Sequence, residues 1–297
     1  MSLSIHRIVL EVLRRVSTAV LLCALAKCAI DVSPQISADR SNRARDRREP
    51  TVAELDSGED MTTVDGGNVG ETEAAVDAGV EVASVTDACQ PGRWILEQEV
   101  ANARDLGGTP VAGGATVGCD LIYRGSMLTD LSRQGCQAFE QLAIRSVIDL
   151  RTPSERADVA DAECIEEWAT VVRAPMPTPY SVSPQDYLAD LYTADSVAAA
   201  FDLLGDPDAY PIYISCIYGR DRTGVLVAVI LLALGAPADV VLAEYELTRE
   251  SGLSSYPASL EAVLEEIERI GGVQGYLLAM GVSMREIETL RSQALVY

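Results

Sequence analysis

The stretch Pro211-Ile212-Tyr213-Ile214-Ser215 leads directly into the nonapeptide Cys216-Ile217-Tyr218-Gly219-Arg220-Asp221-Arg222-Thr223-Gly224. The first five residues have the apolar, β-rich character of a buried strand. An apolar run from Thr223 to Leu234, closed by Gly235, predicts a buried helix. The nonapeptide therefore lies at a turn from a strand end to a helix start, where open α/β sheets bind their ligands.

The chain beyond Pro91 alternates between β-rich and helical patterns. The β-rich runs lie at 121–124, 146–150, 171–174 and 211–215. The helical patterns occupy 131–142, 185–204, 223–234, 238–249, 260–270 and 284–294. Strands that alternate with helices predict an α/β fold with a central, mostly parallel sheet flanked by helices.

The nonapeptide has the composition of an anion-binding loop that contains a nucleophile. Turn amides and the positive end of the following helix bind anions, and we expect them to depress the pKa of Cys216. Five residues separate Cys216 from Arg222, so a wrapped loop turns thiol and guanidinium toward one bound group. We predict that Cys216 attacks a phosphoryl group held by Arg222 and by the rest of the loop: Ile217, Tyr218, Gly219, Arg220, Thr223 and Gly224.

The histidine content and the net charge exclude several classes of catalytic site and of binding partner. The one histidine is His6, in a segment expected to be removed, which excludes Ser-His-Asp and Cys-His arrangements and histidine-ligated zinc. The predicted reaction forms a cysteinyl-phosphate that water hydrolyses, and it needs no metal or cofactor. The formal net charge of -22 argues against nucleic acid as a partner, since phosphate backbones bind positive surfaces. The expected partner is a phosphorylated substrate.

The leaving oxygen needs a proton donor, and two carboxylates are candidates. Asp221 lies inside the loop, and Asp149 ends the β-rich part of Val147-Ile148-Asp149-Leu150-Arg151. Instead of donating a proton, Asp221 could have a structural role, in which its carboxylate pairs with Arg220 or caps the helix. Asp149 and Arg151 either reach the bound phosphate or form an internal ion pair that supports the site.

Several motifs resemble those of the bacterial tyrosine and dual-specificity phosphatases, within the protein tyrosine phosphatase superfamily. That superfamily is marked by Cys-x5-Arg followed by Ser or Thr, and this family's loop reads Cys-x-x-Gly-Lys-Asp-Arg-Thr-Gly. The family's Asn-x-Arg-Asp-Leu-Gly-Gly is matched by residues 102–108, and further matches are Tyr123-Arg124-Gly125-Ser126 and the Asp149-Leu150-Arg151 run with Glu155 after it.

The resemblance implies a protein tyrosine phosphatase-like fold and a phosphomonoesterase acting on phosphotyrosine, phosphoserine or phosphothreonine. It favours Asp221 as the acid, and Arg104 and Asp105 are expected to shape a loop beside the site. Ser215 departs from the family's usual histidine and the Trp-Pro-Asp acid loop is absent, so a phosphate-binding protein without turnover is an alternative. Arg220 replaces the usual lysine, and its charge suits a multiply phosphorylated ligand, which makes phosphoinositides the alternative substrates.

The first 28 residues have the pattern of an export signal. Arg7, Arg14 and Arg15 precede an apolar run at 16–26, which is typical of a secretory signal and too short to span a bilayer. Leu25-Ala26-Lys27-Cys28 resembles a lipoprotein-processing box, although Lys27 stands where a small residue is usual. We expect an exported protein, either periplasmic, held at the cell surface or outer membrane through a lipid on Cys28, or secreted.

A polar segment separates this signal from the α/β region. Residues 49–90 contain acidic residues but no lysine or arginine, and such a segment cannot bury enough apolar surface to fold. The expected organisation is therefore a signal at 1–28, a disordered acidic linker at 29–90 and a phosphatase domain at 91–297.

Five cysteines follow the signal: Cys89, Cys119, Cys136, Cys164 and Cys216. In an oxidising compartment four of them can form two disulfides while the fifth stays a free thiol. Proximity in sequence favours pairing Cys89 with Cys119 and Cys136 with Cys164, although the sequence alone permits three pairings of these four.

Overall fold

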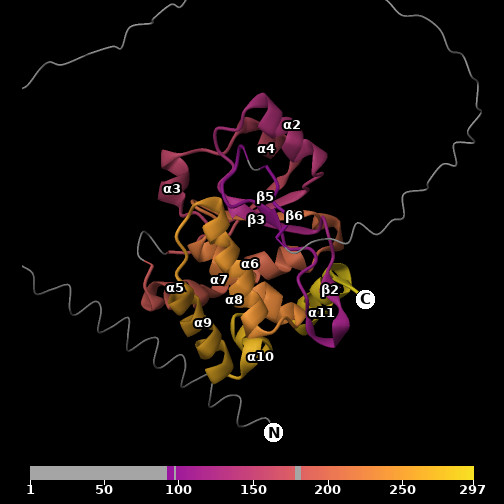
Figure 1. Ribbon diagram of the computed structural model, residues 1–297, viewed down its shortest axis with the longest axis vertical. Coiled ribbons are helices and arrows are strands. Elements are labelled where there is room, and N and C mark those ends of the chain that lie inside the picture. Colours follow the sequence, from indigo (N-terminus) through magenta and orange to yellow (C-terminus); the bar gives the residue numbers. More distant parts are fainter. Residues whose placement is uncertain (1–91, 97, 178–181) are drawn as a thin grey trace, which may run out of the picture. The chain divides into compact units, whose positions relative to one another are not determined.

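The computed structural model describes residues 92–96, 98–177 and 182–297, and the predicted signal (1–28) and linker (29–90) lie outside these ranges (Figure 1). Strand β6 (Ile212–Cys216) is buried throughout and pairs in parallel with β3 (Ile122–Ser126) and β4 (Ser146–Asp149). The five-stranded sheet has the order β1-β3-β6-β4-β5, with β5 (Thr170–Arg173) parallel to β4 and β1 (Arg104–Asp105) antiparallel to β3. The predicted mostly parallel sheet is confirmed.

Alternate residues of the strands cover the two faces of this sheet. On one face Val147 and Tyr213 pack with Phe139 and Ile165 from α2 (Arg133–Gln141) and α4 (Glu163–Trp168). On the other face Ile148, Ile212 and Ile214 belong to a larger core built around α7 (Asp221–Leu234). Figure 1 shows α2 and α4 on one side of the sheet and the later helices on the other.

Helix α7 is the centre of the larger core. Every residue from Arg222 to Leu231 is buried. The helix ends at Leu234 and is capped by Gly235, whose φ of 98° is the left-handed conformation that glycine favours. The other helices on this side are α5 (Pro184–Leu191), α6 (Ala194–Leu204), α8 (Ala238–Glu246), α9 (Pro257–Arg269), α10 (Gly272–Ala279) and α11 (Met284–Ala294). None of the helices in the described ranges is both long and apolar enough to cross a membrane.

Several elements differ from the sequence prediction. The helix predicted at 185–204 is two helices, because α5 ends at Leu191 and the Thr193 hydroxyl donates to the Asp190 carbonyl oxygen at 2.6 Å, before α6 begins. The helix predicted at 238–249 ends as a 3-10 segment, Leu247–Ser251. Helices α3 (Pro153–Asp158), α4 and α10 were not predicted.

The remaining elements are short. They are a two-stranded antiparallel pair, β2 (Thr116–Val117) with β7 (Leu295–Val296), and two 3-10 turns at Ala112–Gly114 and Pro207–Ala209.

Candidate active site

The predicted loop connects the central strand to the central helix. Strand β6 ends at Cys216, opposite Ser126 of β3, and α7 begins at Asp221. Cys216 is a free thiol with 2% of its surface exposed. The nucleophile predicted from the sequence therefore lies at the carboxyl end of the central parallel strand, beside the amino end of a buried helix.

The backbone of this loop has the hydrogen-bonding pattern of an anion cradle. Within the described ranges, the amide N–H groups of Ile217 to Thr223 donate to no backbone or side-chain acceptor. Several carbonyl groups of the same loop are bound, since Ile217 accepts from the Met127 amide at 3.4 Å and Arg220 from the Gly224 amide at 2.8 Å. A turn with bound carbonyls and free amides, at the start of a helix, is suited to an anion.

Arg222 is fixed by a carboxylate from a different part of the chain. Its Nη1 and Nη2 atoms donate to the two carboxylate oxygens of Glu155 at 2.6 and 2.8 Å. Glu155 itself accepts from the Thr152 amide at 2.7 Å, in the capping box that begins α3. This ion pair holds the plane of the guanidinium that the sequence assigns to phosphate binding.

The charges of this pair affect each other's protonation. Burial acts to lower the pKa of Arg222, but the hydrogen bond to Glu155 and the charges of Cys216 and Glu155 outweigh it, so the pKa is raised. Burial acts to raise the pKa of Glu155, but its bonds with Arg222 and Thr152 lower it overall.

Arg220 and Asp221 pair with each other at the start of α7. Nε and Nη2 of Arg220 donate to the two oxygens of Asp221 at 2.9 and 3.1 Å. The Arg220 guanidinium also lies over the rings of Tyr218 and Tyr256, at 5.6 and 4.7 Å from their centroids. The Tyr187 hydroxyl donates to Asp221 at 2.6 Å. The ion pair that the sequence left as an alternative role for Asp221 is therefore present.

Asp149 and Arg151 are held in a separate buried network. Arg151 donates to Asp149 at 3.0 Å and also contacts Asp161, while Arg173 donates to Asp149 at 2.5 Å and to Asp161 at 2.9 Å. Each of Asp149 and Arg151 has about 1% of its surface exposed. The structure shows the internal ion pair, and the binding of substrate by these two residues stays a prediction.

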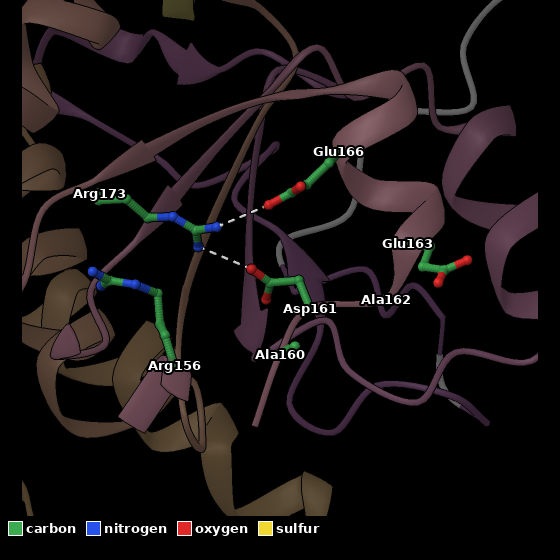
Figure 2. Close-up of a pocket in the computed structure, with 7 residues that line it drawn as sticks. All are labelled: Arg156, Ala160, Asp161, Ala162, Glu163, Glu166 and Arg173. Carbon is green, nitrogen blue, oxygen red and sulfur yellow. Dashed lines mark hydrogen bonds and ion pairs between the residues drawn. The ribbon is translucent and has the colours of Figure 1, made fainter. Parts of the chain in front are cut away.

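A cavity of about 300 Å³ lies beside this network rather than at the loop. Figure 2 shows Arg173 reaching Asp161 and Glu166 across it. Its lining also includes Arg156 and Glu163, and no residue of the nonapeptide. Within the described ranges, no group of three histidine, cysteine, aspartate or glutamate side chains is placed to hold a metal ion.

The remaining loop residues have distinct surroundings. Gly219 has a φ of 61° and packs against the backbone of Gly125, and Gly224 packs against the Tyr245 ring. The Thr223 hydroxyl is buried with no hydrogen-bond partner in the described part of the chain. Tyr218 is 48% exposed, whereas Ile217 is partly buried.

Sequence reasoning missed several groups that contact the loop. Asn102 and Arg124 donate to loop carbonyls, and both lie in matched motifs, but their role depends on the neighbouring strands β1, β3 and β6. Glu244, a buried acid on α8, acts on the loop only through Arg124, and the sequence does not distinguish it from Asp239 and Glu246 of the same helix. Arg104 donates to Glu244, and Asp105 accepts from the Gly107 and Asp120 amides, so both have structural partners, while their role in a loop beside the site stays a prediction.

The cysteines separate into bonded and free groups. Cys136 of α2 and Cys164 of α4 form the disulfide expected from their proximity in sequence. Cys119 is also disulfide-bonded, and its predicted partner Cys89 lies outside the described ranges. Cys216 is therefore a reduced thiol in a domain that contains oxidised cysteines.

Comparison with known proteins places this site in a family. A curated "putative tyrosine-protein phosphatase" of Cupriavidus necator is 25% identical over 195 residues, covering 56% of this chain and 71% of that protein. Among solved structures, the core catalytic domain of the PP-IP phosphatase SIW14 of S. cerevisiae is 19% identical (54% of this chain, 91% of that chain, TM-score 0.35). TpbA of P. aeruginosa is also 19% identical (56% and 90%, TM-score 0.32). The model of the tyrosine phosphatase family matches residues 96–296, and the chain belongs to that family.

Proposed function

We propose that this cysteine-dependent phosphatase acts on phosphotyrosine in proteins, with Cys216 as nucleophile. The observation that supports the assignment is the loop itself, in which a reduced thiol and a fixed guanidinium flank amides that have no acceptor among residues 92–96, 98–177 and 182–297. In the first step Cys216 Sγ bonds to phosphorus and the phosphorus–oxygen bond to the leaving group breaks. In the second step water displaces the thiolate from the cysteinyl-phosphate and releases inorganic phosphate.

Arg222 and the loop amides stabilise the charge that develops on the phosphoryl oxygens. Because Glu155 already fixes Arg222, little reorientation is needed when the substrate binds. The decisive measurement is phosphate release from an aryl phosphate by the purified protein and by Cys216→Ser. Cys216→Ser should abolish turnover and retain binding of a phosphotyrosine peptide. Wild-type protein that binds the peptide but releases no phosphate between about pH 5 and 8 would contradict an enzymatic role.

Phosphoinositides are the second candidate class of substrate, and Arg220 is the residue that favours them. This arginine adds a cation to the loop, but Asp221 accepts from it through both carboxylate oxygens. A second phosphate must therefore compete with Asp221 for this guanidinium, which favours singly phosphorylated substrates. Phosphate release from a phosphotyrosine peptide and from phosphoinositide vesicles, compared at equal enzyme concentration, separates the two classes.

Asp221 is the proposed proton donor to the leaving oxygen. Its side chain is 14% exposed at the first position of α7, and Tyr187 and Arg220 fix its orientation. Asp221→Asn should slow alkyl phosphates far more than nitrophenyl phosphate, because a good leaving group needs little protonation. Equal losses with both substrates would instead assign Asp221 to binding.

The protein is further proposed to be exported. The disulfide between Cys136 and Cys164 supports this location, because disulfides persist in oxidising compartments. Cell fractionation of the full chain, with a variant lacking residues 2–28 as control, tests the location. Incorporation of a labelled fatty acid, compared with Cys28→Ser, tests the lipid anchor. A full chain that stays in the cytoplasm would contradict export.

A further inference from the structure

A buried cluster of three charged side chains lies on the carbonyl side of the catalytic loop. Glu244 of α8 accepts from Arg104 Nε at 2.8 Å through one oxygen and from Arg124 Nη1 at 2.7 Å through the other. Arg104 also donates to the Glu244 backbone carbonyl at 3.0 Å. Both guanidiniums are fully buried and the Glu244 side chain is 6% exposed. The cluster joins β1, β3 and α8.

This cluster reaches the loop through two donors that share one acceptor. Arg124 Nη2 donates to the Gly219 carbonyl oxygen at 2.6 Å, and Asn102 Nδ2 donates to the same oxygen at 2.9 Å. Asn102 Nδ2 also lies 3.4 Å from the Tyr218 carbonyl oxygen. The other end of the Asn102 amide accepts from Arg104, so the cluster fixes the orientation of this side chain.

Peptide planarity links these outer contacts to the inner face of the loop. In a trans peptide unit the C=O and the following N–H point in opposite directions. A Gly219 carbonyl held toward Arg124 therefore turns the Arg220 N–H away from the cluster. In the same way, a Tyr218 carbonyl held toward Asn102 turns the Gly219 N–H away from the cluster. These two N–H groups belong to the set that has no acceptor in the described part of the chain.

We propose that Glu244 is a positioning residue of the phosphatase, which orients the Gly219 and Arg220 amides toward the phosphoryl group by fixing Arg124 and Asn102. Arg124 has to bind Glu244 and Gly219 at the same time, and the planar fork of a guanidinium allows both. Without the carboxylate, two buried guanidiniums would face each other uncompensated. The inference rests on the phosphatase chemistry of the Cys216 loop.

The protonation of the cluster agrees with this role. Burial acts to raise the pKa of Glu244, but Arg104 and Arg124 outweigh it and lower the pKa, which keeps the carboxylate ionised. Burial and the charge of Arg124 lower the pKa of Arg104 to about 10. A buried ion cluster is a weak source of stability compared with apolar packing, so its contacts with the loop suggest a task beyond stability.

The test compares catalysis and oxyanion binding in Glu244→Gln with those of the wild-type full chain. Glutamine keeps the shape but offers one acceptor oxygen, so one guanidinium loses its partner. We expect kcat with nitrophenyl phosphate to fall by about 10- to 100-fold, with a smaller change in KM and a parallel rise in the inhibition constant of vanadate. Leu290→Ala, in the core at α11, is the control that lowers Tm and leaves kcat per folded molecule unchanged.

Two further variants keep the test decisive if Glu244→Gln does not fold. Asn102→Gly removes one donor to Gly219, and it suits the φ of 58° at this position. Arg124→Lys keeps the charge but cannot bind Glu244 and Gly219 together, so we expect it to lower kcat more than its change in Tm explains. Variants with reduced Tm but wild-type kcat and vanadate inhibition would show that the cluster only stabilises the fold, and they would overturn the proposal.

Binding of tungstate separates this inference from the proposed catalytic reaction. Calorimetry on Cys216→Ser and on Cys216→Ser/Glu244→Gln measures the affinity of the loop for tungstate in proteins that cannot turn over substrate. We expect the double variant to bind at least tenfold more weakly. Equal affinity would overturn the role of Glu244 even if the wild-type enzyme is active. An inactive wild-type enzyme with this affinity difference would instead contradict the proposed reaction and leave the positioning role supported.

Discussion

Substitution of Gly219 by alanine is a sharp test of the loop geometry. A Cβ atom at this position would lie 2.1 Å from the carbonyl carbon of Gly125, 2.3 Å from its oxygen and 2.5 Å from the Ser126 nitrogen. All three atoms belong to the backbone of β3, which is paired with β6 and cannot move as a side chain can. The loop itself must therefore shift away from β3.

The size of the effect follows from two contributions. The φ of 61° at Gly219 costs an L-residue about 1 kcal/mol, and the overlap with β3 adds about 1 to 3 kcal/mol of overpacking. A total of about 3 kcal/mol lowers the Tm of a domain of this size by about 6 to 12 °C. Relief of the overlap requires a shift of about 1 Å, and a displacement of that size at a catalytic group costs about 100-fold in rate.

The assay is kcat with nitrophenyl phosphate together with a thermal melt of each variant. Gly281→Ala is the matched control, because Gly281 has a φ of 91° and nothing within 4 Å of an added Cβ. This control has only the conformational cost, so we expect a Tm about 2 to 4 °C lower and an unchanged kcat. The reasoning is refuted if Gly219→Ala keeps the wild-type kcat, or if its Tm falls no further than that of the control.

Two further predictions concern the ion pair between Glu155 and Arg222 and the disulfide between Cys136 and Cys164. Since the pKa of Glu155 is lowered, its ion pair with Arg222 contributes stability above the ordinary value of 4.5, which is lost as the pH falls through the lower folded value. Glu155→Gln should therefore reduce the loss of stability below pH 4.5 in chemical denaturation and lower kcat/KM about tenfold, and an unchanged acid profile would contradict this. Replacing Cys136 and Cys164 by serine opens a loop with a separation of 28 residues, which should cost about 3 to 4 kcal/mol and leave kcat unchanged at 25 °C. A Tm within about 2 °C of wild type would contradict the second expectation.

The parts of the fold that the sequence predicts best are those set by local patterns. The strand before Cys216 and the helix after Thr223 are both apolar runs bounded by glycine or proline, and both are present as β6 and α7. The break between α5 and α6 was missed because the alanine-rich run continues the helical pattern past Thr193. That break depends on a side-chain bond that competes with the helix and leaves little trace in periodicity.

In the candidate site, too, the sequence predicts the residues that are close together in the chain and misses the partners that are distant from them. Cys216 and Arg222 are close in sequence, so their spacing predicts a shared ligand. The partner of Arg222 is Glu155, 67 positions away, and the contacts of Glu244 with Arg124 span 120 positions. Such pairs arise from the order of strands in the sheet, which a single sequence does not specify. The sequence offered Glu155 and Arg124 only as parts of motifs, without their partners.

The guanidinium groups around the loop have a practical consequence for handling this enzyme. The chain has one lysine, Lys27, and one histidine, His6, so every side-chain cation from residue 92 onward is an arginine. Reagents that are selective for amines therefore find no lysine between residues 92 and 297. Dyes or surfaces coupled with amine-selective chemistry would attach only through the amino-terminal part of the chain, so the arginines of the phosphate site stay unmodified and all molecules are attached from the same end.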